Sequence, residues 1–180
     1  VGFNFRITEF QAAILLVQLT RLDEQTRTRN ENASYLSKEL LKIKGIEPLK
    51  RGPEITRHSY HLYVFKYDKE EFEGLPRGIF LEALRAEGIP CSPGYVPLYK
   101  ERFMLNLAQD PLLSKLYGEK IDYSRVKLPT TELACYEEGV WFFQNMLLGT
   151  REDMDDIVNA IIRIKENAKE LLKRSLSVGR

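Results

Sequence analysis

Ten residues near the start of the chain, Phe10 to Leu19, are apolar except for Gln11 and Gln18. In a helix this composition places apolar side chains nearly all round the axis, and such a helix is buried on more than one side. Each fully buried Leu or Ile contributes roughly 1.5–3 kcal/mol, so exposing the helix to water is costly. In a chain of 180 residues the segment therefore needs either a central position or a partner surface.

The residues just before this segment predict a helix start and an anion site. Thr8 and Gln11 have the spacing of a capping box, in which each side chain bonds to the backbone N–H of the other residue. Asn4 and Arg6 stand immediately outside this helix N-terminus, where free N–H groups and the helix dipole favour anions. Amide donors and a guanidinium suit a phosphate. The alternative is that both side chains only stabilise their own loop.

The remaining sequence predicts alternating helices and short strands. Residues 60–67 are rich in aromatic and β-branched side chains and are apolar on both faces, which indicates a central strand. Gly45, Pro48, Gly52 and Pro53 mark a loop before that strand. The fold class is therefore α+β, with a short, mostly antiparallel sheet packed with helices and a long N-terminal helix. We expect helices over 8–42 (with a bend near 22–23), 76–87, 110–118, 130–138 and from 150 onward, and strands over 60–67, 89–92 and 139–144, with Trp141, Phe142 and Phe143 in the core.

Composition narrows the class of protein. Hydrophobic residues make up 43% and charged residues 29% of the chain, as in ordinary soluble proteins, and residues 1–180 most simply form one domain. The formal net charge of +1 gives no sign of a nucleic-acid or membrane partner. No apolar run has the length of a membrane span. Two cysteines, Cys91 and Cys135, suggest neither a disulfide framework nor a metal site, so we expect a reduced, cytoplasmic location.

Residues 2–13 read Gly-Phe-Asn-Phe-Arg-Ile-Thr-Glu-Phe-Gln-Ala-Ala. This string resembles the Gly-x-Asn-x-Arg-x-Thr-x-x-Gln-Ala-Ala pattern of the DegT/DnrJ/EryC1/StrS aminotransferases, which use pyridoxal 5′-phosphate to aminate keto-sugars and keto-cyclitols. Softer matches extend the resemblance to about Asn167. It implies that the chain is the small C-terminal domain of a fold-type I aminotransferase, with the cofactor-binding domain upstream. It also implies a homodimer in which Asn4 reaches the phosphate of the cofactor held by the neighbouring subunit, with Arg6 either beside it or bracing the loop.

The segment Gly94-Tyr95-Val96-Pro97-Leu98-Tyr99 is the second candidate for a site. Many members of the family carry a His-Tyr-x-Pro-x-His-like segment that contributes to the substrate pocket. Here Tyr99 stands where such relatives have His, and this version is closer to the scyllo-inosose type of cyclitol aminotransferase. The resemblance thus assigns Tyr95 and Tyr99 to the substrate pocket. Without the family resemblance, the sequence Pro93-Gly94-Tyr95 would be interpreted only as a turn, which is the more frequent role of such a segment.

Other polar residues have structural interpretations. His58 and His61 are three apart, and in a strand this spacing points side chains to opposite faces, which argues against a metal site. Amino transfer with this cofactor needs a lysine amine as nucleophile and proton shuttle, and no lysine here has a recognisable context for that role. We therefore assign no catalytic residue and expect this sequence alone to be inactive.

Two functions remain. The first is the C-terminal domain of an enzyme that transfers an amino group from glutamine or glutamate to a keto-cyclitol or keto-sugar. The alternative is a non-catalytic dimerisation or ligand-binding module of the same fold.

Overall fold

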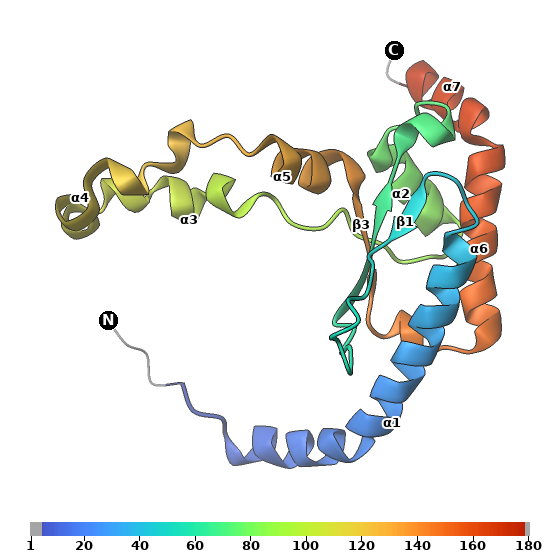
Figure 1. Cartoon of the computed structure of the whole chain (residues 1–180), viewed down its shortest axis with the longest axis horizontal. Helices are drawn as coiled ribbons and strands as arrows, with labels where there is room; N and C mark the ends of the chain where they lie inside the picture. Colours follow the sequence, from blue (N-terminus) through green and yellow to red (C-terminus); the bar gives the residue numbers. More distant parts are fainter. Residues whose placement is uncertain (1–4, 179–180) are drawn as a thin grey trace.

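The structure, a computed structural model, describes residues 5–178 apart from the side chains of Glu119 and Val178. A small sheet is covered by helices on one face, and two long segments project away from it (Figure 1). The α+β class predicted from the sequence is confirmed. The helices and strands are α1 (Glu9–Leu40), β1 (Ile46–Pro48), β2 (Leu62–Tyr67), α2 (Arg77–Ala86), α3 (Arg102–Leu105), α4 (Pro111–Tyr117), α5 (Pro129–Leu133), β3 (Gly139–Phe143), α6 (Arg151–Glu166) and α7 (Ala168–Val178).

The sheet has the order β1-β2-β3, and both neighbouring pairs are antiparallel. The central position predicted for the strand within residues 60–67 is confirmed, although β2 begins two residues later than predicted. Residues 46–48 lie in the predicted loop but form β1, where Ile46 is buried and pairs with Tyr67. A strand of three residues is too short to show an alternating pattern, so only its pairing with β2 defines it.

The two faces of the sheet have different surroundings. On the inner face Phe65 and Phe142 are fully buried, with ring centroids 5.1 Å apart. Helices α1, α2 and α6 cover this face (Figure 1). On the outer face Val64 and Trp141 are half-buried and Phe143 is exposed. The core assignment of Phe143 was therefore wrong, because successive side chains of a strand point to opposite faces.

The first helix starts as predicted. The Gln11 N–H donates to Thr8 Oγ1 at 3.3 Å, and the Thr8 N–H donates to Gln11 Oε1 at 2.8 Å, which completes the capping box. Helix α1 is continuous, and Figure 1 shows it bending between its first and second parts, as the sequence predicts. In the second part Leu36 and Leu40 are fully buried.

The first part of α1 is exposed. Phe10 is 86% exposed, which excludes a central position within this chain and leaves the partner surface as the remaining alternative. Within the described residues, no helix combines the length and the hydropathy that crossing a membrane requires. The exposed side chains of this part are Phe10, Ile14, Leu15, Leu16, Val17, Leu19 and Leu22.

Helix α6 begins with a second capping box. The Thr150 N–H donates to Asp153 Oδ2 at 2.6 Å, and the Asp153 N–H donates to Thr150 Oγ1 at 3.2 Å, so the helix starts at the position predicted for it. The predicted single C-terminal helix is instead divided at Asn167, where α6 ends and α7 follows. The Asn167 side chain donates to the Arg163 carbonyl at 2.8 Å. Such local bonds compete with helix continuation, which accounts for the division.

Replacing Thr150 with alanine should lower the free energy of unfolding by about 1 kcal/mol, because the substitution removes the N-cap acceptor. Urea unfolding followed by circular dichroism measures this loss. Thr20→Ala is the matched control, since Thr20 is exposed in a helix interior and its hydroxyl only bonds to the Val17 carbonyl. Alanine favours helix interiors, so this control should lose nothing. Equal losses of unfolding free energy in the two variants would contradict the role of Thr150 as the N-cap of α6.

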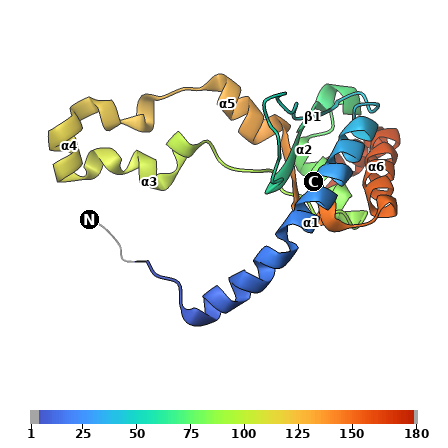
Figure 2. The same ribbon diagram turned by 60° about the horizontal axis from the view of Figure 1, so that its bottom comes forward.

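Residues 98–138, which we call the arm, leave the sheet after α2 and return to it at β3 (Figures 1 and 2). Its helix α4 lies within the predicted range 110–118: Asp110 Oδ1 accepts from two backbone N–H groups at 2.9 Å each, and Gly118 follows the helix with φ +57°. Helix α3 was not predicted from the sequence. The predicted helix over 130–138 is present as α5 and a π-helical turn over 134–138.

Candidate functional site

The outer face of the sheet is hollowed beside the root of the arm. The hollow has a volume of about 320 Å³, and Val64 and Trp141 of the sheet lie in its wall. Lys66 and Glu138 form an ion pair of 3.1 Å between Nζ and Oε1 in the same wall. We call this the outer hollow; its lining residues are Leu49, Val64, Phe65, Lys66, Pro93, Gly94, Tyr95, Ala134, Cys135, Glu138, Gly139 and Trp141.

Tyr95, predicted to contact substrate, lies in this wall. Its ring meets the Trp141 ring edge-on, with centroids 4.3 Å apart and an interplanar angle of 78°. Gly94 has φ +85°, and a Cβ atom there would come within 2.8 Å of Trp141 Cε2. The loop therefore lies tightly against the indole, while Tyr95 itself is 69% exposed. An exposed ring with a hydroxyl beside an apolar hollow is suited to a small cyclic polyol, which has both apolar and hydrogen-bonding edges.

Tyr99 has different surroundings. It is 6% exposed, and its hydroxyl donates to Glu132 Oε1 and accepts from the Leu128 N–H at 3.3 Å. Lys100 Nζ forms an ion pair with the same carboxylate oxygen at 3.2 Å. The hydroxyl of Tyr99 is thus engaged between the two sides of the arm. Direct substrate contact by Tyr99 stays a prediction, and the contacts of this chain give the residue a structural role.

The Tyr99, Glu132 and Lys100 group keeps its charges across neutral pH. The hydrogen bond from Tyr99, followed by that from Lys100, lowers the pKa of Glu132 from 4.5. The ionised Glu132 therefore stabilises the folded chain above pH 4.5, and this stabilisation is lost as the pH falls through the lowered pKa. Burial and then the hydrogen bond to Glu132 raise the pKa of Tyr99 from 10.0, and the same carboxylate raises the pKa of Lys100 from 10.5. The stabilisation that protonated Tyr99 and Lys100 give to the folded chain is lost only as the pH rises through their raised pKa values. The three side chains therefore keep their interactions between about pH 5 and pH 10.

The candidate phosphate-binding residues lie elsewhere. Asn4 is outside the described residues, and Arg6 stands two positions before the N-cap Thr8. The buried part of α1 begins at Thr26, which is about 27 Å from Thr8 along a helix that rises 1.5 Å per residue. Figures 1 and 2 both show the start of α1 well away from the sheet. A single copy of the chain therefore does not bring Arg6 to the outer hollow.

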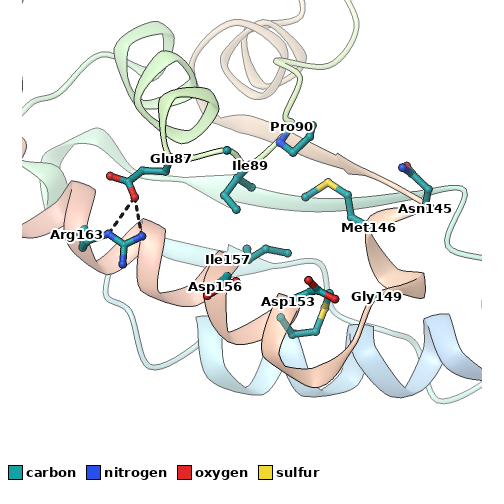
Figure 3. A pocket seen from close by; sticks show the side chains of 12 residues that line it. Glu87, Ile89, Pro90, Asn145, Met146, Gly149, Asp153, Asp156, Ile157 and Arg163 are labelled. Carbon is teal, nitrogen blue, oxygen red and sulfur yellow. Dashed lines mark hydrogen bonds and ion pairs between the residues drawn. The ribbon is translucent and has the colours of Figure 1, made fainter.

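A second hollow, of about 560 Å³, lies between the end of α2 and α6 (Figure 3). Arg163 Nη2 and Nε donate to Glu87 Oε2 at 2.6 and 3.0 Å, so these two charges neutralise each other. Asp153 in its wall belongs to the capping box of α6 with Thr150. None of the residues predicted to bind a ligand lines this hollow. We therefore place the candidate site at the outer hollow.

The histidines are not in a strand, contrary to the prediction. His58 and His61 precede β2, because Tyr60 has φ +47° and interrupts the extended backbone. His58 Nδ1 accepts from the Tyr60 N–H at 2.9 Å. Across the described residues, no group of three His, Cys, Asp or Glu side chains is arranged to hold a metal ion.

Sequence reasoning missed Arg77, which holds the root of the arm. Its Nη1 donates to the Pro93 carbonyl at 3.0 Å and to the Gly139 carbonyl at 2.8 Å. Burial lowers the pKa of Arg77. The two acceptors are far apart in sequence and meet only because Ser92 pairs with Trp141 across the sheet edge. No spacing in the sequence signals this contact.

The fold resembles that of solved aminotransferases. The structure of 3-amino-5-hydroxybenzoic acid synthase aligns with a TM-score of 0.68 at 23% identity, over 91% of this chain and 40% of that one. A sugar aminotransferase from Micromonospora echinospora aligns with a TM-score of 0.62 at 24% identity, over 89% of this chain and 36% of that one. At these identities the likeness establishes the fold alone.

The sequence comparison establishes the family. Residues 1–161 match the DegT/DnrJ/EryC1/StrS aminotransferase family, and the chain belongs to it. An L-glutamine:2-deoxy-scyllo-inosose aminotransferase from Streptoalloteichus tenebrarius is 35% identical over 173 residues, which are 95% of this chain and 40% of that protein. The chain thus spans about two fifths of the length of the curated relatives it matches. The family resemblance predicted from residues 2–13 is confirmed.

Proposed function

We propose that this chain is the C-terminal domain of an enzyme that transfers an amino group from L-glutamine or glutamate to a keto-cyclitol or keto-sugar. The observation that carries the proposal is the family match over residues 1–161, supported by relatives named L-glutamine:2-deoxy-scyllo-inosose aminotransferase. The outer hollow suits such an acceptor, because Tyr95 offers an exposed ring and a hydroxyl beside an apolar wall. Cys91 and Cys135 are both free thiols, in line with a cytoplasmic enzyme.

Pyridoxal 5′-phosphate, when bound, supplies the electron sink on which amino-group transfer depends. The start of α1 fits its phosphate, because the helix N-terminus favours an anion and Arg6, a cationic residue, stands two positions before the N-cap Thr8. Asn4 would add amide donors. Since Arg6 lies far from the outer hollow of its own copy, we assign Asn4 and Arg6 to the active site of a second copy in a homodimer. The lysine that bonds the cofactor, and most cofactor contacts, would come from outside this sequence, so these 180 residues alone would be inactive.

Replacing Asn4 with alanine should weaken cofactor binding by about tenfold or more in the native protein that contains this sequence, because one hydrogen bond to a charged phosphate is lost. The test is a titration of apoprotein with pyridoxal 5′-phosphate, followed by absorbance. Asn159→Ala is the control, since Asn159 is exposed on α6. Unchanged affinity in the Asn4 variant would remove Asn4 from the site. An assay with L-glutamine and 2-deoxy-scyllo-inosose on the same protein tests the reaction.

A non-catalytic dimerisation or ligand-binding module is the second candidate, and the exposed first part of α1 is the observation in its favour. The intact mass of the native polypeptide separates the two. A mass well above 21.0 kDa, together with bound cofactor, supports the enzyme. A mass of 21.0 kDa without cofactor binding favours the module.

A further inference from the structure

The two sides of the arm are joined near the sheet by successive contacts. We call residues 92–100 the outgoing leg and residues 128–141 the returning leg. Nearest the sheet, Ser92 and Trp141 exchange backbone hydrogen bonds of 3.0 and 2.9 Å. Further out, Arg77 donates to one carbonyl on each leg. These contacts fix where the legs leave the sheet but not how they continue.

The next contact outward is the group around Tyr99. Its hydroxyl joins the outgoing leg to Glu132 and to the Leu128 N–H of the returning leg, and Lys100 pairs with the same carboxylate at 3.2 Å. Lys100 Nζ also lies 5.4 Å from the centre of the Tyr136 ring. Among the described residues, this is the outermost hydrogen-bonded connection between the legs.

Tyr95 lies on the outgoing leg between these two connections. Arg77 holds the leg on the sheet side of Tyr95, and Tyr99 holds it on the arm side. The segment between them is short and carries Gly94 against the Trp141 indole. The position of the Tyr95 ring over the outer hollow therefore depends on both ends of this segment being held.

We propose that Tyr99, Glu132 and Lys100 form a lock that positions Tyr95 at the outer hollow. In this arrangement Tyr99 is a positioning residue, which acts on a bound substrate through the outgoing leg and not by touching it. The existence of the lock is independent of the proposed function. Its consequence for amination rests on that function, so the two are tested by separate measurements.

Trp141 is the single tryptophan of the 180 residues, so its fluorescence reports directly on the contact with Gly94 and Tyr95. Tyr99→Phe keeps the buried ring and removes only the hydroxyl. We expect Trp141 in this variant to become more accessible to acrylamide, and limited proteolysis within the arm to become about tenfold faster, as expected on losing a hydrogen bond to a charged group. Tyr117→Phe is the matched control, because Tyr117 is exposed in the arm and the substitution removes a tyrosine hydroxyl away from the lock.

Glu132→Gln should act in the same direction, and the double variant should add little to the larger single effect, because both changes break one interaction. Native-like quenching and cleavage in Tyr99→Phe would overturn the lock. So would fully additive effects in the double variant, since Tyr99 and Glu132 would then act independently.

Kinetics of the native protein test the positioning role. We expect Tyr99→Phe to raise the KM for the keto-cyclitol about tenfold while the affinity for pyridoxal 5′-phosphate stays unchanged, since the cofactor phosphate is assigned to the start of α1. An unchanged KM in an active enzyme would overturn the role of the lock in positioning Tyr95. Absence of amination in the unmodified protein, with the fluorescence and proteolysis results as expected, would reject the proposed function and leave the lock standing.

Discussion

Replacing Gly94 with alanine should lower the free energy of unfolding by about 2–5 kcal/mol. A non-glycine residue in the left-handed region costs about 1–2 kcal/mol, and forcing an extra methyl into a packed site costs about 1–3 kcal/mol more. Both costs apply here, because Gly94 has φ +85° and its Cβ would lie 2.8 Å from Trp141 Cε2 and 2.9 Å from Nε1. Thermal or urea unfolding of the purified chain measures the loss.

Gly88→Ala separates the two costs. Gly88 has φ +83°, almost the same backbone conformation, but no atom lies within 4 Å of a Cβ built there. This control should lose only about 1–2 kcal/mol, the backbone cost. Trp141 fluorescence should change in the Gly94 variant and stay native-like in the Gly88 variant. Equal losses in both variants would show that the Gly94 loop does not lie against the indole as described.

The same substitution probes the candidate site. Relief of the contact requires Trp141 or the Gly94 loop to move, and either movement shifts the Tyr95 ring that rests on the indole at 4.3 Å. In the native protein we therefore expect Gly94→Ala to weaken binding of the amino acceptor more than binding of the cofactor. Stability and substrate binding are linked here, because the contact between Gly94 and Trp141 both stabilises the fold and holds the Tyr95 ring at the outer hollow.

Local signals in the sequence were sufficient for most helix ends. The helices predicted to begin near residues 8, 110 and 150 do begin there, and they are capped by Thr8 with Gln11, by Asp110, and by Thr150 with Asp153. Each of these side chains bonds to backbone within three residues of itself, so a short window of sequence contains the whole interaction. Signals of this kind do not depend on the rest of the fold.

The features that the sequence did not predict depend on distant partners. Tyr99 meets Glu132 and Arg77 meets Gly139 only after the arm has returned to the sheet. The exposure of Phe143 follows from which face of the sheet the helices cover, which the apolar composition of β3 does not reveal. The candidate site is assembled from such contacts. The sequence therefore indicated Tyr95 through family resemblance, while its surroundings required the structure.

The exposed first part of α1 carries two apolar stripes on different sides. Phe10, Ile14 and Val17 follow the i, i+4, i+7 spacing, and so do Leu15, Leu19 and Leu22. At about 100° per residue, the second stripe lies about 140° around the helix from the first. Gln11 and Gln18 lie between the stripes on one side. On the other side Ala12, Ala13 and Leu16 lie between them, so apolar side chains face several directions and the helix is suited to contact two surfaces at once.

We therefore expect the purified chain to self-associate, and each stripe to contribute separately. Leu15→Glu with Leu19→Glu should weaken association at least about tenfold, since each buried Leu contributes roughly 1.5–3 kcal/mol and tenfold corresponds to about 1.4 kcal/mol. Ile14→Glu with Val17→Glu should weaken it independently. Sedimentation velocity over a concentration series measures both effects.

Leu176→Glu is the matched control, because Leu176 is 69% exposed on α7, against 61% for Leu19, yet lies at the opposite end of the chain from the stripes. This variant should associate like the unmodified chain. A chain that stays monomeric at all concentrations would mean that exposed apolar area on α1 does not drive contact by itself. If only one pair of substitutions had an effect, a single surface would meet this helix, and the homodimer we propose would have to use that stripe alone.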